Sequence, residues 1–221
     1  MKIKSIAVAL SMALSFSTFA GTTDYNSVYA KNYALAQAKV TGYDSPSKWN
    51  YWFKDWTSQG GNCTNFANQA IRAGLAETTS PKTIFNLNST YNGDGSWYYT
   101  HSYQSSAWKG AQEFFDYANA QTGGMTGMNF TFQTSDSPTT GLSFSKVAIG
   151  DIIFVDWEND GDIDHTMIVT GGTTRGYSST YVSYHSSSNT TPKKNKSLSS
   201  LNTQFNYNNI FYVYRPTSYV D

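Results

Sequence analysis

The sequence predicts an α+β fold in which N-terminal helices pack on an antiparallel β-sheet. Two observations favour it: apolar residues recur at helical spacing through much of the first half of the chain, and the period changes to two from Met128 onward. Helices followed by strands are typical of the α+β class. The roughly 200 residues after the first twenty suit a single domain with a substantial core, which we place at 21–221.

The first twenty residues have the features of a cleavable secretory leader. Lys2 and Lys4 precede a mostly apolar run over 6–16, and the segment ends in Thr18-Phe19-Ala20. The run is short for a bilayer span, and a polar segment follows it. We therefore expect cleavage after Ala20, a secreted or periplasmic protein, and no stable membrane anchor.

Charge and composition narrow the classes of partner. Removal of the leader lowers the number of lysines and arginines from 15 to 13, against 15 acidic residues, for a formal charge of −2. A chain with so small a net charge is not expected to bind nucleic acid or anionic membranes by electrostatic attraction. The 17 Tyr, 13 Phe and 6 Trp suit a core and a groove for polar ligands.

Three segments have the apolar spacing of amphipathic helices. The first covers 24–40, the second begins at Cys63 and stops near Gly74, and the third covers 105–120. Between the second and third, residues 78–104 are predicted to be a loop because proline and glycine interrupt any regular pattern.

The second half of the chain alternates with period two and predicts strands separated by Gly, Ser, Asn and Asp clusters. The expected strands are 128–133, 151–157, 165–170, 180–185 and 210–214. An antiparallel meander is the simplest way to join them. Residues 186–200 are expected to form a polar loop.

Cys63 is the single cysteine of the chain, which excludes a disulfide within a monomer. It follows a glycine turn at the start of a predicted helix, where the positive helix end lowers the pKa of a thiol and favours a nucleophile. The alternative is a buried, inert thiol. Backbone N–H groups at this helix start can hold an oxyanion, with Gln59 or Asn62 either as side-chain donors or as residues that satisfy the turn.

Three histidines are candidates for the base that activates this thiol: His101, His165 and His185. His165 opens an apolar strand, where sheet residues can meet a helix N-terminus. His185 ends the next predicted strand, so antiparallel pairing can bring it close enough to orient His165. His101 lies in a loop-like aromatic region and is expected to be substrate-side or structural. For each histidine the alternative is an ordinary hydrogen-bonded side chain.

Several of these motifs together resemble the putative amidase domain family, which is similar to the NlpC-type and CHAP cell-wall peptidases. The motifs are a Tyr/Ala-rich helix followed by Gly60-Gly61-Asn62-Cys63-Thr64-Asn65-Phe66-Ala67-Asn68-Gln69, Gly150-Asp151-Ile152-Ile153 and Asp164-His165-Thr166. The resemblance spans residues 24–200 and implies a papain-like, NlpC/CHAP-like fold with Cys63 at a helix start and His165 on a strand.

The resemblance also implies a third catalytic residue and a substrate class. NlpC-type enzymes carry a polar group, often His, on the strand after the base, a position that His185 matches and for which Asn189 is an alternative. The family motif usually has Asp where this chain has Asn62. The implied substrates are cell-wall peptides, that is, peptidoglycan.

An acidic segment precedes His165 and approximates a calcium-binding loop, with carboxylates at alternate positions and Gly161 at the sixth. The candidate ligands are Asp156, Glu158, Asp160, Asp162 and Asp164. Met167 stands where an EF-hand has its bidentate Glu, so the pattern predicts either a calcium-stabilised hairpin or a plain acidic hairpin. Carboxylates beside His165 raise its proton affinity, and a bound cation offsets that effect.

Together these observations predict an exported cysteine hydrolase of amide bonds, in which Cys63 attacks, His165 transfers the proton and His185 orients the imidazole. The chemistry needs no cofactor, and structural calcium is optional. One alternative is a non-enzymatic, calcium-stabilised module that binds glycan or peptide, with an unreactive Cys63. Another is a transamidase, in which an amine resolves the thioester. We expect a monomer; an inhibitory partner is compatible with the sequence but not identified by it.

Overall fold

The computed structural model describes residues 21–38, 52–54, 56, 62–86, 97–100, 102–121, 125–136, 141–172, 176–185, 193–204 and 208–220. Their helices are α1 (Ser27–Gln37), α2 (Cys63–Leu75), α3 (Pro81–Asn86), α4 (Ser106–Lys109), α5 (Ala111–Ala120), α6 (Leu198–Gln204) and the 3-10 turn η3 (Phe144–Lys146). The strands are β1 (Thr22–Asp24), β2 (Gly127–Ser135), β3 (Ile152–Asp156), β4 (His165–Gly172), β5 (Thr180–Tyr184), β6 (Lys193–Ser197) and β7 (Ile210–Val220). The predicted α+β class is confirmed.

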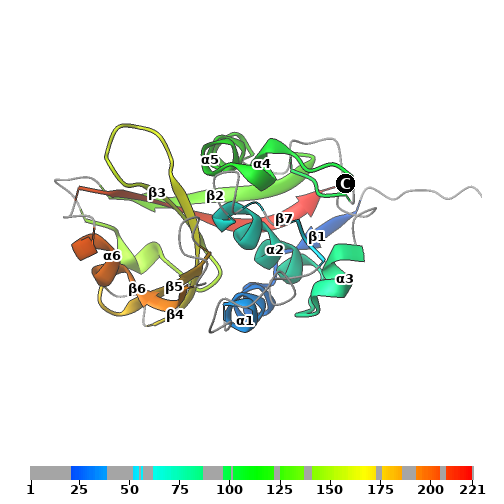
Figure 1. Ribbon diagram of the computed structural model, residues 1–221, viewed down its shortest axis with the longest axis horizontal. Helices are drawn as coiled ribbons and strands as arrows, with labels where there is room; N and C mark the ends of the chain where they lie inside the picture. The colour runs from blue at the N-terminus through cyan, green and yellow to red at the C-terminus, as the bar shows by residue number, and fades with distance from the viewer. Residues whose placement is uncertain are drawn as a thin grey trace, which may run out of the picture.

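All pairs in the sheet are antiparallel, and consecutive strands from β3 to β6 form a meander. The long strand β7, red in Figure 1, breaks the simple order that the sequence predicted. One edge of β7 pairs with β2 over most of its length, while β3 and then β1 pair with its other edge. Strand β7 therefore joins the meander to the first strand of the described chain.

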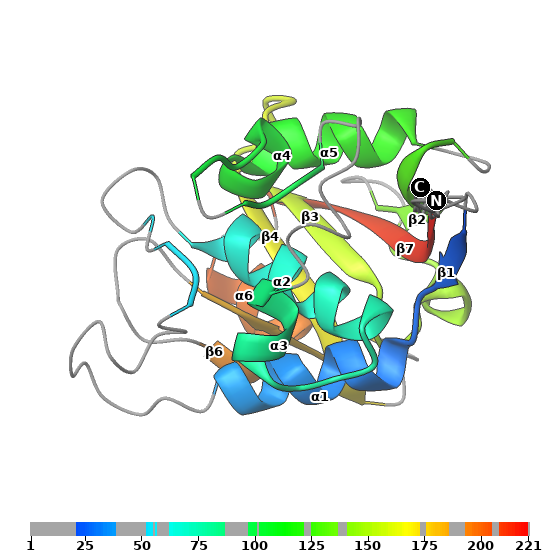
Figure 2. The same ribbon diagram turned by 90° about the vertical axis from the view of Figure 1, so that its right-hand side faces the viewer.

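The sheet has an apolar core on each face because its strand side chains alternate. On β3, Ile152 and Phe154 pack on the side of α1, α2 and α5, while Ile153 and Val155 pack on the side of α6. Figure 2 shows α1, α2 and α3 in front of the sheet and α6 behind it. Burial on both faces explains why β3 is apolar at four successive positions.

Helix α2 is buried along its whole length, including its polar residues. The amide of Gln69 donates to Asn65 Oδ1 at 3.0 Å and accepts from the Tyr33 hydroxyl at 2.6 Å. Asn68 donates to the carbonyl of Ala107 at 2.8 Å. Because these buried amides are hydrogen-bonded to two other segments, α1 and α4, they hold α2 and its first residue in place.

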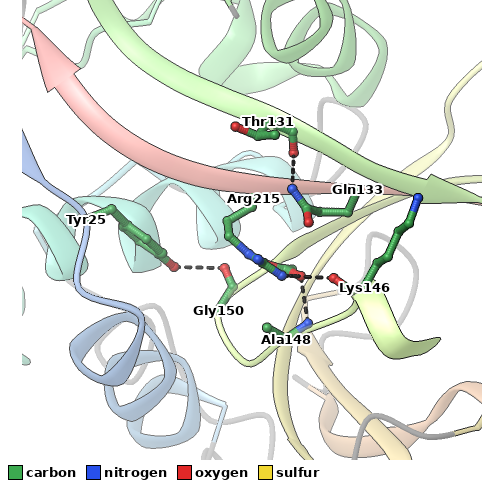
Figure 3. Close-up of polar contacts among 8 residues, drawn as sticks. Tyr25, Thr131, Gln133, Lys146, Ala148, Gly150 and Arg215 are labelled. Carbon is green, nitrogen blue, oxygen red and sulfur yellow. Dashed lines mark hydrogen bonds and ion pairs between the residues drawn. The ribbon is translucent and has the colours of Figure 1, made fainter. Parts of the chain in front are cut away.

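A partly buried ion pair between Arg215 and Asp151 ties β7 to the residue before β3; Figure 3 shows Arg215 beside Ala148 and Gly150. Arg215 donates from Nε and Nη2 to the two carboxylate oxygens of Asp151 at 2.8 and 3.0 Å, and Ala148 N–H donates to the same carboxylate at 2.7 Å. Burial raises the pKa of Asp151, and the hydrogen bonds and charge of Arg215 oppose that effect. Tyr25 donates to the carbonyl of Gly150 at 2.8 Å, which attaches the chain before α1 to the same point.

Gly150 itself is required at this junction. Its φ is +89°, and a Cβ there would lie 2.5 Å from the side chain of the first residue of α1. The Gly150-Asp151 motif therefore has a structural role at the junction of α1, β3 and β7.

The structure corrects several predicted boundaries. Gly110 has extended backbone angles, φ −112° and ψ 143°, and divides the predicted helix 105–120 into α4 and α5. The predicted loop 78–104 contains α3, and the predicted loop 186–200 contains β6 and the start of α6. The lysine-rich sequence of β6 is typical of a polar loop, but lysine is also common on edge strands.

Gly74 lies inside α2, which ends at Leu75. No helix among the described residues has the length and apolarity needed to cross a membrane. The predicted leader, residues 1–20, lies outside the described chain.

Candidate active site

Cys63 is the first residue of α2 and is 8% exposed. The preceding residue, Asn62, turns its side-chain oxygen toward the chain around it: Oδ1 accepts from Trp56 N–H at 2.9 Å and from Asn65 Nδ2 at 3.2 Å. The Asn62 side chain therefore links Trp56 to the first turn of α2, and its role as an oxyanion donor stays a prediction. Gln59, the other candidate oxyanion donor, lies outside the described residues.

His165 is the first residue of β4, so its ring lies at the end of the sheet and is 9% exposed. Tyr184 meets it edge-on, with ring centroids 4.8 Å apart, and Trp157 is tilted against it at 5.8 Å. Within the described part of the chain, its Nε2 atom has no hydrogen-bond partner. Two aromatic side chains thus position the imidazole.

Opposing effects set the pKa of the Cys63 thiol. Burial raises it, while the charge of His165 and a side-chain hydrogen bond with His165 lower it. Hydrogen bonds from the Thr166 backbone and the Thr64 side chain lower it further, and the result is a pKa of about 7 in place of 9.0. At neutral pH about half of such a thiol is thiolate, the nucleophilic form. The structure thus brings together Cys63 and His165, the two residues that the sequence paired.

His185 follows β5, the neighbour of β4, but its ring lies against α2. It stacks on Phe66, with ring centroids 4.2 Å apart and an angle of 29° between the planes. His165 instead contacts Tyr184, the residue before His185, because successive side chains of a strand point to opposite faces. The role of His185 as the orienting residue stays a prediction. Asn189, its alternative, and His101 lie outside the described residues.

The acidic hairpin between β3 and β4 brings together three of its five candidate ligands. Carboxylate oxygens of Asp156, Glu158 and Asp164 lie within 4.8 Å of one another, in a group that does not include Asp160 or Asp162. Partial desolvation and the neighbouring Asp164 carboxylate raise the pKa of Glu158.

Hydrogen bonds already close this hairpin. The Asp156 carboxylate accepts from the N–H groups of Asp160 and Gly161 at 3.2 and 2.9 Å, and Asp164 accepts from Trp157 N–H at 2.8 Å. Both predicted versions of the hairpin fit these contacts, and calcium binding stays a prediction.

A comparison with models of protein families identifies the family of this chain. The family model described as a putative amidase domain matches residues 22–214. The chain belongs to the putative amidase domain family. The match covers both core faces of the sheet as well as Cys63, His165 and His185. Comparisons with curated proteins and with solved structures found no match. Family membership indicates hydrolysis of an amide bond.

Two threonines at the site were missed at the sequence level. Thr64 Oγ1 lies 3.8 Å from Cys63 Sγ and 3.2 Å from Thr166 Oγ1. A signal was present, since each threonine directly follows one member of the cysteine–histidine pair. Side chains next to a catalytic residue normally point elsewhere, which is why the sequence alone gave them no role.

Proposed function

We propose that this member of the putative amidase domain family is a cysteine-dependent hydrolase with Cys63 as nucleophile and His165 as general base. The observation that carries the proposal is the pairing of a buried thiol at a helix start with an imidazole that, with its neighbours, brings the thiol pKa to about 7. A buried, inert cysteine would instead have a raised pKa. A cysteine at a helix start beside a histidine on a strand also supports the papain-like relationship.

The proposed reaction runs through a thioester. His165 takes the thiol proton, and the thiolate attacks the carbonyl carbon of the amide. N–H groups at the start of α2, which have no partner within the helix, stabilise the oxyanion. His165 then protonates the leaving amine, the C–N bond breaks, and a water deprotonated by His165 releases the acid and regenerates the thiol. We propose His185 as the residue that orients His165, acting from the neighbouring strand.

We propose that the substrates are peptide bonds of peptidoglycan. We also propose that the enzyme acts after export and after cleavage of the leader behind Ala20. Two features support this assignment: the leader-like first twenty residues and the resemblance to cell-wall peptidases. The near-neutral charge suits a substrate with mixed polar and apolar groups.

The test is direct digestion with purified residues 21–221. Peptidoglycan fragments are incubated with the wild type and with Cys63→Ala, and mass spectrometry identifies new amine and acid ends. The expected result is a pair of new ends, absent with Cys63→Ala, together with a transient acyl adduct on Cys63. Cleavage that survives Cys63→Ala would overturn the cysteine mechanism.

Added primary amines separate hydrolysis from transfer. Free acid as the product supports the hydrolase, whereas amine adducts formed in place of acid would overturn it in favour of a transamidase. A thiol that shows neither reaction nor adduct, with ordinary reactivity, would favour a binding module.

A further inference from the structure

The side chains that immediately follow the nucleophile and the base face each other across the helix–sheet interface. Thr64 and Thr166 are both fully buried, and their hydroxyl oxygens are 3.2 Å apart. Thr64 Oγ1 is also 3.8 Å from Cys63 Sγ, within hydrogen-bond range for sulfur. A continuous row of polar atoms therefore runs from β4 to the thiol.

The ionisation of Cys63 fixes the direction of the hydrogen bonds in this row. A thiolate has no proton, so it can only accept, and the Thr64 hydroxyl must donate to it. The oxygen of Thr64 is then free to accept from the hydroxyl of Thr166, the other donor in the row. Both hydroxyl protons are thus directed toward the sulfur in the ionised state, whereas a neutral thiol permits other orientations.

We propose that Thr64 and Thr166 form a two-hydroxyl relay that stabilises the Cys63 thiolate, with Thr64 as a positioning residue on the sulfur and Thr166 acting through it. This inference rests on the proposed function, since it assigns residues that support the same nucleophile. Charge-assisted hydrogen bonds are stronger than neutral ones, so the relay favours the thiolate over the thiol. It also connects α2 to β4 beside the base, which keeps nucleophile and base at a constant separation.

Other titratable groups near the sulfur do not replace this contribution. The first turn of α2 contains no acidic residue. His165 acts on the sulfur from β4, and His185 lies against Phe66, one turn further along α2. The backbone of Thr166 also hydrogen-bonds to the sulfur, so a valine at this position removes the hydroxyl but keeps that contact.

The experiment measures the alkylation rate of Cys63 against pH in six forms of residues 21–221. These are the wild type, Thr64→Val, Thr64→Ser, Thr166→Val, the double variant Thr64→Val/Thr166→Val and the control Thr170→Val. Thr170 is a buried threonine on the same strand whose hydroxyl lies 2.9 Å from that of Ser183, so its valine variant loses a comparable hydroxyl pair away from the sulfur. Circular dichroism and a melting curve confirm that each variant is folded.

The expected result is a wild-type midpoint near 7 that rises by about 1 in Thr64→Val, so that alkylation at pH 7 slows about fivefold. Thr64→Ser restores the wild-type midpoint, Thr166→Val raises it less than Thr64→Val, and Thr166→Val adds nothing in a Thr64→Val background. Thr170→Val leaves it unchanged.

An unchanged midpoint in folded Thr64→Val, or an equal rise in Thr170→Val, would overturn the relay while leaving the hydrolase proposal intact. If Thr64→Val does not fold, Thr166→Val decides: its own midpoint rise supports the relay, and a wild-type midpoint overturns it. A wild-type midpoint near the ordinary 9.0 would instead count against the proposed function itself.

Discussion

Replacing His165 with alanine tests the central contact of the site. In the wild type, burial raises the pKa of the Cys63 thiol, but His165 lowers it through its charge and a hydrogen bond, giving about 7. His165→Ala removes both of these effects and keeps the burial, so the pKa should rise well above 7, opposed only by the hydrogen bonds with Thr166 and Thr64. If the rise is about 1 or more, the thiolate fraction at pH 7 falls from about one half to about one tenth or less, and alkylation at that pH slows at least about fivefold.

The assay is the rate of iodoacetamide labelling across pH 5–10, with intact mass to confirm a single adduct on Cys63. The control is Thr170→Val, a change at a buried position of the same strand as His165 whose hydroxyl lies 2.9 Å from that of Ser183. We expect that control to keep a midpoint near 7. A folded His165→Ala protein that labels with the wild-type midpoint would refute the dyad, and so would an equal rise in both variants.

Three further predictions concern the surroundings of the site. In hydrolysis assays His185→Ala should lower kcat, because it removes the residue proposed to orient the base; an unchanged kcat would remove it from the proposed triad. Arg215→Met should lower the free energy of unfolding by about 2 kcal/mol at pH 7, because it leaves the buried Asp151 carboxylate without its ion-pair partner. The loss is moderate because the Arg215 side chain is 38% exposed. That loss should appear as a melting temperature about 4–8 °C lower and should shrink as pH falls through the raised pKa of Asp151, whereas a deficit independent of pH would contradict the ion pair as its cause. Calcium should raise the melting temperature relative to chelator, and Glu158→Gln should reduce the rise; identical curves with and without calcium would dismiss the metal from the hairpin.

Local signals in the sequence predicted the start of α2 and the pairing of Cys63 with His165. The glycine turn places the helix start at Cys63, and the switch from an acidic loop to an apolar strand places His165 at a strand start. Both signals are contained within a few neighbouring residues. The family motifs point to the same two positions, so the sequence was sufficient to place Cys63 at a helix start and His165 at a strand start.

The burial of the polar side of α2 could not be predicted in the same way. The apolar spacing identified one buried face, and Asn65, Asn68 and Gln69 would normally face solvent. Their partners, such as Tyr33 and the carbonyl of Ala107, come from segments far away in sequence. The strand pairs of β7 depend on equally distant contacts, which is why the predicted meander was only partly right.

The pairing of β7 also sets a condition on how this protein can be made. Strand β2 has no strand partner other than β7 in the described chain, and the edge of β3 away from β4 is likewise completed by residues 210–214. Until these residues are synthesised, both strands present open edges, which are prone to pair with other chains. Closure of the sheet therefore waits for contacts of high sequence separation, a feature of slow folding.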